Sequence, residues 1–233
     1  MGQITTIGFD ADDTLWHSER AFRLTEARFA ELLADHVDAP SLSERLLDTE
    51  KRNLQFYGFG RKGFVLSMIE TAIQITGGKV PVSVLSALIG LGRDMAAHPI
   101  EIMPGVLETL ERMAEHYRII LITKGDLLDQ EQKLARSGLG GLFHAVEIVS
   151  DKSPVTYQRL FSRHGDGAER SMMVGNSLRS DIVPAIEAGS WGVFIPHELT
   201  WAAEHAEAPS DAPRFRQLAR MDELPDLLGR IDR

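Results

Sequence analysis

The chain has 233 residues, 43% of them hydrophobic and 25% charged, which is an ordinary composition for a globular protein with a sizeable core. Its net charge of −9 argues against a nucleic-acid backbone as a partner, and the absence of cysteine excludes disulfides, thiolate metal sites and cysteine nucleophiles. No signal-peptide pattern follows Met1 and no apolar run approaches the ~20 residues of a membrane span, so we expect a cytoplasmic protein that acts without a membrane.

The N-terminal segment Ile4–Phe9 is rich in β-branched and aromatic residues, which predicts a short buried strand. Asp10, Asp12 and Asp13 follow at once, and in an extended backbone Asp10 and Asp12 point to the same side. Open α/β sheets bind their ligands at the carboxyl ends of their strands. Alone, this pattern is most simply an acidic turn, so a catalytic interpretation needs polar groups at other strand ends. Asp13 is predicted to be a turn residue without a catalytic role.

Helical periodicity begins after Leu15 and continues to residue 99. Breaks at Pro40, Gly58–Gly63 and Gly77–Gly78 divide it into four helices, and no convincing strand interrupts them. Ser41 and Glu44 resemble a capping box, which predicts that Ser41 caps the second helix. We therefore expect residues 16–99 to form a helical subdomain.

From residue 100 onward, predicted strands alternate with predicted helices. The expected strands are 118–123, 145–149, 171–174 and 192–195, and the expected helices are 106–117, 126–135, 155–164, 181–188 and 220–233. This alternation is typical of a parallel sheet with crossover helices, which the first strand is expected to join. The sequence thus predicts an α/β, Rossmann-like core of residues 1–15 and 100–233. The polar, alanine-rich stretch 197–213 is predicted to be a surface connection in which His197 and His205 are surface histidines.

Polar residues follow four of the five predicted strands. Asp10 and Asp12 follow the first, Thr123 and Lys124 end the second, and the loops after the third and fourth carry the residues Lys152, Asn176 and Asp181. The turn after Thr123 leads into a helix N-terminus, which favours an anion. Any one of these residues can be a cap or a loop charge, but four such clusters at one edge of one sheet favour a shared site.

The charges of this set point to phosphate chemistry. Three converging carboxylates, Asp10, Asp12 and Asp181, would repel one another without a counter-ion. Mg²⁺, which prefers oxygen ligands and binds carboxylates together with water and phosphate, is the natural cation. Lys152 can neutralise a phosphate oxygen and keep Asp10 ionised. The residues therefore suit phosphoryl transfer, where neutralisation and positioning supply most of the rate.

The chain resembles the haloacid dehalogenase-like (HAD) hydrolase superfamily, in its phosphatase branch with a helical C1-type cap. Four ordered motifs carry the resemblance: D-x-D-x-T-L at 10–15, the strand end at Thr123, Lys152, and the pattern G-[D/N]-x-x-x-x-D that ends at Asp181. Many members have Asp where this chain has Asn176. Compared with Asp, Asn176 keeps an oxygen ligand but lacks one negative charge.

The resemblance implies a mechanism. Asp10 would attack phosphorus and form an aspartyl-phosphate, and Asp12 would act first as acid and then as base. Thr123 and the next amide would hold the phosphoryl oxygens, and Lys152 would stabilise charge. Asp10, the backbone carbonyl of Asp12, Asp181 and Asn176 would bind Mg²⁺. The substrate would be a small phosphorylated metabolite; a sugar phosphate, a phosphoglycolate-like acid and a nucleotide all stay open.

Two features of the helical block leave alternatives. The stretch Gly58–Gly63 matches G-x-G-x-x-G, but no strand precedes it, so a dinucleotide site is rejected. The same loop either brings Arg61 or Lys62 to the substrate or is only a hinge. His17, at the entrance to the block, is expected to contact the leaving group, with hinge packing as its alternative.

Three other functions compete with a phosphatase. A 2-haloacid dehalogenase would also use the first Asp but needs neither the acid Asp12 nor a metal at Asp181. A phosphonate hydrolase needs a desolvated cap lysine, and nothing marks Lys51, Lys62 or Lys79 as one. A non-catalytic phosphate-binding protein would not need the complete set of polar residues.

Overall fold

The chain folds into two compact units in the computed structural model, which describes residues 3–231. The core unit comprises the described residues of Met1–His17, Ile100–Lys124 and Gln130–Arg233. The helical unit comprises Ser18–Pro99 and Gly125–Asp129. The sequence places this division after residue 15, whereas the structure keeps residues 16 and 17 with the core.

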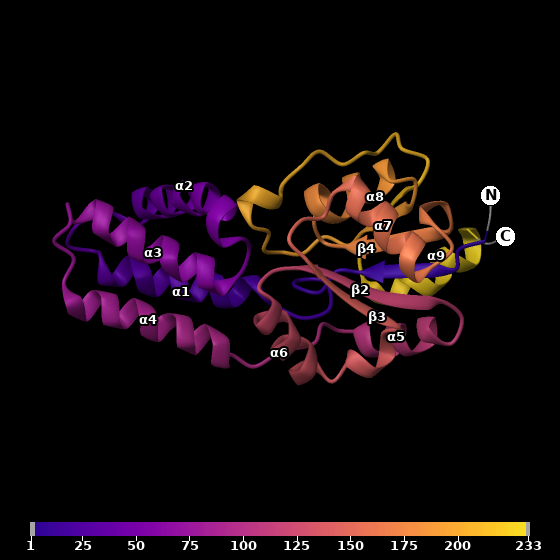
Figure 1. The fold of residues 1–233 in the computed structure, drawn as a ribbon, viewed down its shortest axis with the longest axis horizontal. Helices are drawn as coiled ribbons and strands as arrows, with labels where there is room; N and C mark the ends of the chain where they lie inside the picture. The colour runs from indigo at the N-terminus through magenta and orange to yellow at the C-terminus, as the bar shows by residue number, and fades with distance from the viewer. Residues whose placement is uncertain (1–2, 232–233) are drawn as a thin grey trace. The chain divides into compact units, whose positions relative to one another are not determined.

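The core unit is built on a parallel sheet of six strands in the order β3-β2-β1-β4-β5-β6. Figure 1 labels β2, β3 and β4 of this sheet. The strands are β1 (Thr6–Phe9), β2 (Arg118–Lys124), β3 (Ala145–Val149), β4 (Ser171–Gly175), β5 (Trp191–Phe194) and β6 (Phe215–Gln217). The parallel α/β sheet is confirmed, and the five predicted strands are present. The sixth, β6, was missed because it has only three residues, two of them polar, and pairs only with β5 at the edge.

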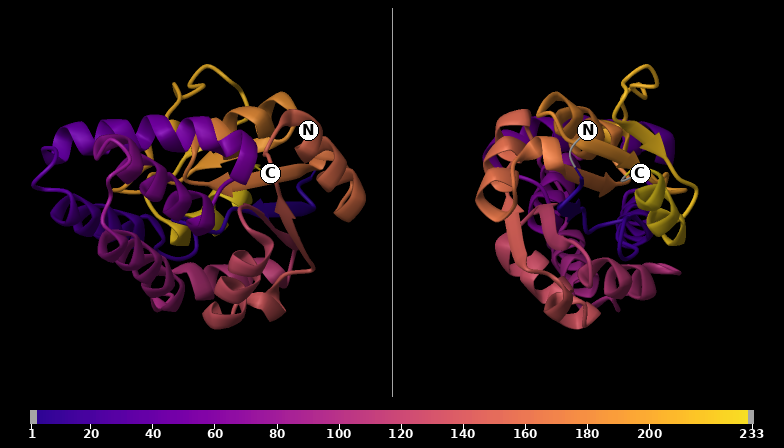
Figure 2. Two further views of the ribbon diagram at one scale, coloured as in Figure 1. Left: turned by 60° about the vertical axis from the view of Figure 1, so that its left-hand side comes forward. Right: turned by 90° about the vertical axis from the view of Figure 1, so that its right-hand side faces the viewer.

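Alternating residues of β2 contribute to opposite faces of the sheet. Ile119 and Leu121 pack into a cluster with α5 (Val106–Ala114) and α9 (Leu224–Ile231). Ile120 and Ile122 pack into a second cluster with α7 (Pro154–His164) and α8 (Val183–Glu187). The apolar run of β2 is therefore buried on both faces, as expected of a central parallel strand. Figure 2 shows these helices from two further sides.

The remaining helices of the core differ slightly from prediction. The expected helix at 126–135 is α6 (Leu127–Ser137), and short 3₁₀ turns lie at Gly140–Leu142, Ala168–Arg170, Ala202–Glu204 and Met221–Glu223. The expected helix at 181–188 begins earlier, as a π-helical turn at Leu178–Ile182 that leads into α8. The last two residues of the helix expected at 220–233 lie outside the described residues.

The helical unit contains α1 (Glu19–Leu32), α2 (Ala39–Tyr57), α3 (Arg61–Ile75) and α4 (Val82–Ala97), so the four predicted helices are confirmed. One apolar cluster joins them, with Phe29, Leu46, Met68 and Leu88 fully or almost fully buried. No helix within residues 3–231 is long and apolar enough to cross a membrane.

The predicted N-cap of α2 is wrong. Asp38, not Ser41, caps the helix, because its carboxylate accepts the Ser41 backbone N–H at 3.0 Å and the Ser41 hydroxyl at 2.8 Å. Pro40 then occupies the first helical turn, where a missing N–H costs nothing. The sequence-based assignment treated Pro40 as a break, although proline is favoured just after an N-cap.

Replacing Asp38 with alanine should lower the free energy of unfolding by about 1 kcal/mol, because the first turn of α2 loses its acceptor. Urea unfolding followed by circular dichroism measures this difference. Asp38→Asn is the matched control and should retain most of the stability, since asparagine caps helices about as well as aspartate. Equal stability of the alanine variant and the wild type would contradict the assignment.

The topology brings three loops of the core together. β1 lies between β2 and β4. On one side of β1 the sheet continues with β2 and β3, and on the other side with β4, β5 and β6. A crevice at such a switch point, outside the carboxyl ends of the strands, is where open α/β sheets bind ligands. Asp10 follows β1 directly, so it lies at this position.

Candidate active site

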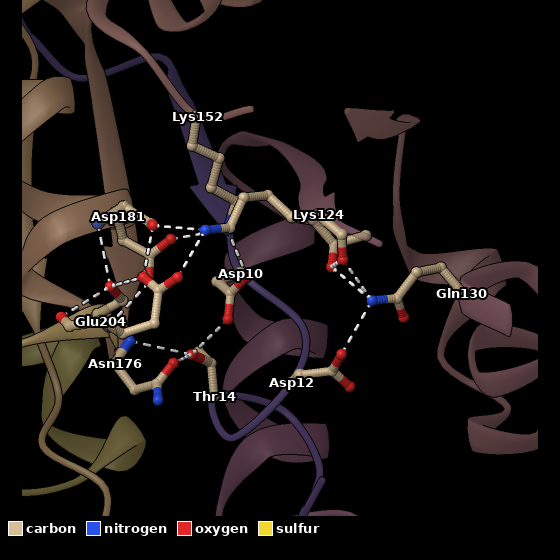
Figure 3. Close-up of polar contacts among 12 residues, drawn as sticks. Asp10, Asp12, Thr14, Lys124, Gln130, Lys152, Asn176, Asp181 and Glu204 are labelled. Carbon is tan, nitrogen blue, oxygen red and sulfur yellow. Dashed lines mark hydrogen bonds and ion pairs between the residues drawn. The ribbon is translucent and has the colours of Figure 1, made fainter. Parts of the chain in front are cut away.

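Three of the predicted residues form the centre of the site (Figure 3). The Lys152 ammonium contacts the Asp10 carboxylate and lies 2.7 Å from Oδ1 of Asp181. Lys152 comes from the loop after β3, Asp10 from the end of β1 and Asp181 from the π-helical turn after β4. All three side chains are buried. The motifs thus converge, as parallel strand ends at one edge of a sheet predict.

Burial and mutual charge shift the pKa values of this cluster. Burial, with the neighbouring Asp181 carboxylate, raises the pKa of Asp10 to about 7 despite the opposing effect of Lys152. Burial alone would lower the pKa of the Lys152 ammonium, but the two carboxylates outweigh it and raise that pKa. Two buried carboxylates therefore share one cation, and the cluster favours a further positive charge.

A glycine and a backbone amide position Asp181. The carboxylate of Asp181 accepts the Ser177 backbone N–H at 2.9 Å. A Cβ atom at Gly175 would lie 2.3 Å from Oδ2 of Asp181, so any larger residue there would displace the carboxylate. The glycine of the fourth motif is therefore required by close packing against its own final aspartate.

Thr14 links Asp10 to Asn176. Its hydroxyl lies 3.1 Å from Oδ2 of Asp10 and 3.2 Å from Oδ1 of Asn176, and it accepts the Asn176 backbone N–H at 3.1 Å. One hydroxyl proton can serve only one of the two oxygens at a time. Asn176 therefore lies beside the Asp10 cluster, and Thr14, the threonine of the D-x-D-x-T-L motif, connects them.

The carboxylate of Asp12 lies among three donors. Trp16 Nε1 donates at 2.8 Å, Gln130 Nε2 at 2.9 Å, and the Lys133 ammonium lies 2.9 and 3.0 Å from the two oxygens. Burial alone would raise the pKa of Asp12, but Lys133 and the two hydrogen bonds outweigh it and lower that pKa. The structure thus stabilises the ionised form of Asp12.

Gln130 and Lys133 are functional candidates that sequence reasoning missed. They are three residues apart on α6, so they lie on one face of that helix and can both reach Asp12. Their sequence signal is two polar residues at helical spacing shortly after the Thr123 turn. This pattern does not distinguish site residues from the exposed face of a helix, which has the same spacing of polar residues.

Lys133→Met should shift the acidic limb of the pH–rate profile to higher pH, because the Lys133 ammonium lowers the pKa of the Asp12 carboxylate and its loss would raise that pKa. Initial rates of phosphomonoester hydrolysis, the reaction that the family resemblance implies, measured from pH 4.5 to 9 test the shift. Lys79→Met is the matched control, since Lys79 is exposed and belongs to the helical unit. An unchanged limb in Lys133→Met would mean that Asp12 does not control it.

The two residues that end β2 have different partners. Thr123 is buried, and its hydroxyl accepts from Gln130 at 3.1 Å. The Lys124 ammonium lies 2.7 Å from Glu204 and 2.6 Å from the Ser180 hydroxyl. Burial alone would raise the pKa of Glu204, but Lys124 and two serine hydroxyls outweigh it and lower that pKa. Lys124 is therefore neutralised by a residue from the segment after β5.

The prediction that residues 197–213 form only a surface connection is wrong at two positions. Glu204 enters the polar network through Lys124, and Ser177 also donates to it at 2.5 Å (Figure 3). His197 is buried, with 9% of its surface exposed, whereas His205 is exposed as expected. No local pattern marks Glu204 or His197, because their partners lie far away in the sequence.

Two predicted substrate contacts have protein partners. Arg61, in the helical unit, forms an ion pair with Asp129 and donates to the Met95 carbonyl at 2.5 Å. His17 has its Nδ1 atom 3.3 Å from Nε2 of His197. Neither residue is among the contacts of Asp10, Lys152 and Asp181 described above.

The donor atoms around Asp10 fit a hard divalent cation. The carboxylates of Asp10 and Asp181 and the amide oxygen of Asn176 are oxygen donors of the type that Mg²⁺ prefers. The raised pKa of Asp10 also reflects a shortage of positive charge beside it. The residues present therefore fit the group that the sequence predicts.

Known proteins are similar to this chain in sequence and in fold. The family model of haloacid dehalogenase-like hydrolases matches residues 4–189. A haloacid dehalogenase-like family hydrolase from Xanthomonas campestris is 40% identical, with a TM-score of 0.88 over 98% of this chain and 92% of that one. The structure of YfnB from Bacillus subtilis bound to magnesium has the same fold, with a TM-score of 0.70 over 98% of this chain and all of that one, at 17% identity.

A curated relative is the glyceraldehyde 3-phosphate phosphatase of Methanothermobacter thermautotrophicus. It is 32% identical over 111 residues, which are 45% of this chain and 49% of that enzyme, so the match covers about half of the relative's length. The family model covers most of this chain, and the motifs of the family converge in its structure. The chain belongs to the haloacid dehalogenase-like hydrolases.

Proposed function

We propose that the protein is a Mg²⁺-dependent phosphomonoester hydrolase that acts on a small phosphorylated metabolite through an aspartyl-phosphate on Asp10. The observation that carries the proposal is the contact of one buried ammonium, Lys152, with both Asp10 and Asp181. A cation beside the nucleophile and a second carboxylate for a metal are what phosphoryl transfer to a carboxylate requires.

The proposed roles follow the position of each group. Asp10 attacks phosphorus, Lys152 neutralises charge on the phosphoryl oxygens, and Thr123 with the following amide binds those oxygens. Asp12 protonates the leaving alcohol and then takes a proton from the water that hydrolyses the intermediate. Gln130 and Lys133 hold the Asp12 carboxylate in place.

Mg²⁺ would be held by the carboxylates of Asp10 and Asp181, the backbone carbonyl of Asp12 and the oxygen of Asn176. When bound, it would neutralise phosphate charge and orient the phosphoryl group. Lys124 and Arg61 each form an ion pair with a carboxylate, and His17 lies beside His197, so we do not assign these three residues to phosphate. The curated phosphatase acts on a three-carbon phosphate, which supports a small metabolite as the substrate class.

Binding of Mg²⁺ should weaken about tenfold per pH unit below pH 7, because the proton on Asp10, whose pKa is about 7 without metal, must leave before the carboxylate can act as a ligand. Above pH 7 the carboxylate is already ionised, and the affinity should level off. Titration calorimetry with Mg²⁺ between pH 5.5 and 8.5 measures this. A constant affinity across that range would contradict the assignment of Asp10 as a ligand.

A screen of phosphorylated metabolites with Mg²⁺, with p-nitrophenyl phosphate as a positive control, tests the function. Release of inorganic phosphate that chelation abolishes supports it. A parallel assay with 2-chloropropionate measures chloride release, the reaction of a dehalogenase. Chloride release without phosphate release would overturn the proposal, and so would no activity on any phosphomonoester.

A further inference from the structure

Three residues outside the phosphate site place nitrogen and oxygen donors together within the core unit. Asp13 lies in the turn after β1, His17 is the last core residue before the helical unit, and His197 follows β5. One ligand atom from each lies within 4.8 Å of the other two. The two histidines are separated by 180 residues in the sequence, so only the fold brings this set together.

Two of the three distances between these donor atoms match ligands around one metal ion, and the third is no longer than 4.8 Å. Nδ1 of His17 lies 3.3 Å from Nε2 of His197, and Nε2 of His197 lies 3.6 Å from Oδ1 of Asp13. Zinc bonds of about 2.0–2.1 Å in tetrahedral geometry separate neighbouring donor atoms by about 3.3–3.4 Å. A contact of 3.6 Å is too long for a hydrogen bond but suitable for two ligands of one ion.

The ring of His197 is oriented as a metal ligand would be. Its Nδ1 atom lies 2.7 Å from the Leu199 carbonyl oxygen and 3.2 Å from the Leu199 amide. Leu199 holds this edge of the ring from both its carbonyl and its N–H, and the tautomer that donates Nδ1–H to the carbonyl presents the Nε2 lone pair toward His17 and Asp13. Metal-binding histidines commonly donate the other ring N–H to a backbone carbonyl in this way.

Asp13 has an unusual backbone. Among residues 3–231 it is the only non-glycine residue with a positive φ, at 60°. Aspartate tolerates this conformation better than most residues, but it still costs free energy, and such outliers concentrate at functional sites. Asp13 and His197 are both buried, so the carboxylate faces the histidine in a place that water reaches poorly.

We propose that Asp13, His17 and His197 bind a zinc ion, with a fourth position left for water or a ligand oxygen. Two imidazoles and one carboxylate are typical zinc donors, whereas the oxygen set at Asp10 and Asp181 suits Mg²⁺. The zinc ion connects the turn after β1, the end of the N-terminal core segment and the segment after β5. Zinc binding by these three residues does not depend on whether the protein is a phosphatase.

The experiment uses the full chain, stripped with a chelator, then loaded with Zn²⁺ or Co²⁺ in excess Mg²⁺ and desalted. We expect about one Zn²⁺ retained per chain by elemental analysis, a higher Tm, and the intense visible absorption of tetrahedral Co²⁺. His17→Ala and His197→Ala should each weaken Zn²⁺ binding by more than roughly 10- to 100-fold, which is the usual cost of removing a residue that only hydrogen-bonds to a metal ligand.

Two variants keep the test specific. His205→Ala alters an exposed histidine of the same segment and should retain zinc like the wild type. Asp181→Asn should also retain it, because its carboxylate belongs to the other site. No retained zinc and no Co²⁺ spectrum in the wild type would overturn the proposal, whatever the variants do. Unchanged binding in both histidine variants, or loss of binding in Asp181→Asn, would overturn it as well.

Discussion

Asp10→Asn should hydrolyse phosphomonoesters at less than about one-thousandth of the wild-type rate, because an amide cannot attack phosphorus and form the covalent intermediate. Asparagine has nearly the same size as aspartate, so a lower rate would reflect the missing nucleophile and not a change in packing. Steady-state assays with p-nitrophenyl phosphate and Mg²⁺ measure the effect. Rapid quenching with labelled substrate should also trap phosphoprotein in the wild type and none in the variant.

Folding is the control for this variant. Lys152 still lies 2.7 Å from Asp181, so the buried ammonium keeps a partner. The pKa of Asp10 is raised from 3.8 to about 7 in the folded state, so stability falls as the pH rises from 3.8 to about 7. Above about pH 7 the full cost of the ionised carboxylate is present. A neutral asparagine avoids this cost, and the Tm at pH 8 should not fall. Full Mg²⁺-dependent activity in a folded Asp10→Asn protein would disprove the mechanism.

Asp12→Asn should lower kcat by about 10²- to 10⁴-fold, the usual effect of removing an acid–base group. The effect should depend on the leaving group. The three donors around Asp12 favour its ionised form, so the structure supports its role as a base more directly than its role as an acid. Hydrolysis of the intermediate should therefore slow even when the leaving group needs no proton.

This predicts a burst with p-nitrophenyl phosphate. The p-nitrophenolate ion leaves without protonation, so Asp10 should still be phosphorylated and then wait for an unactivated water. Stopped-flow absorbance should show about one equivalent of product per enzyme followed by slow turnover. An alkyl phosphate should show no burst, because its alcohol needs the missing acid. A linear time course at the wild-type rate would exclude Asp12 from either step.

Most of the fold was predictable because its signals are local. The apolar run in β2 and the helical periodicity of 16–99 predict their elements without knowledge of any partner. The predictions failed where a distant contact decides. β6 is a strand only because β5 offers an edge to pair with. The N-cap of α2 is a different case, because a local contact decides it: Ser41 and Glu44 resemble a capping box, but Asp38, three residues before Ser41, caps the helix.

The sequence by itself determined that Asp10, Lys152 and Asp181 would meet. Each follows a parallel strand, and parallel strands in one sheet end at the same edge, so order along the chain was sufficient. It also determined the parallel α/β core and the family to which the chain belongs.

Only the tertiary structure decided what surrounds these groups. Asp12 lies beside Lys133, Lys124 beside Glu204, and Asp13 beside His197, and these pairs are separated by 80 to 184 residues with no shared pattern between them. Side chains that meet across such separations are set by how loops pack, and loop packing depends on the whole fold. Asp13, which appeared to be only a turn residue, gained a candidate role for that reason.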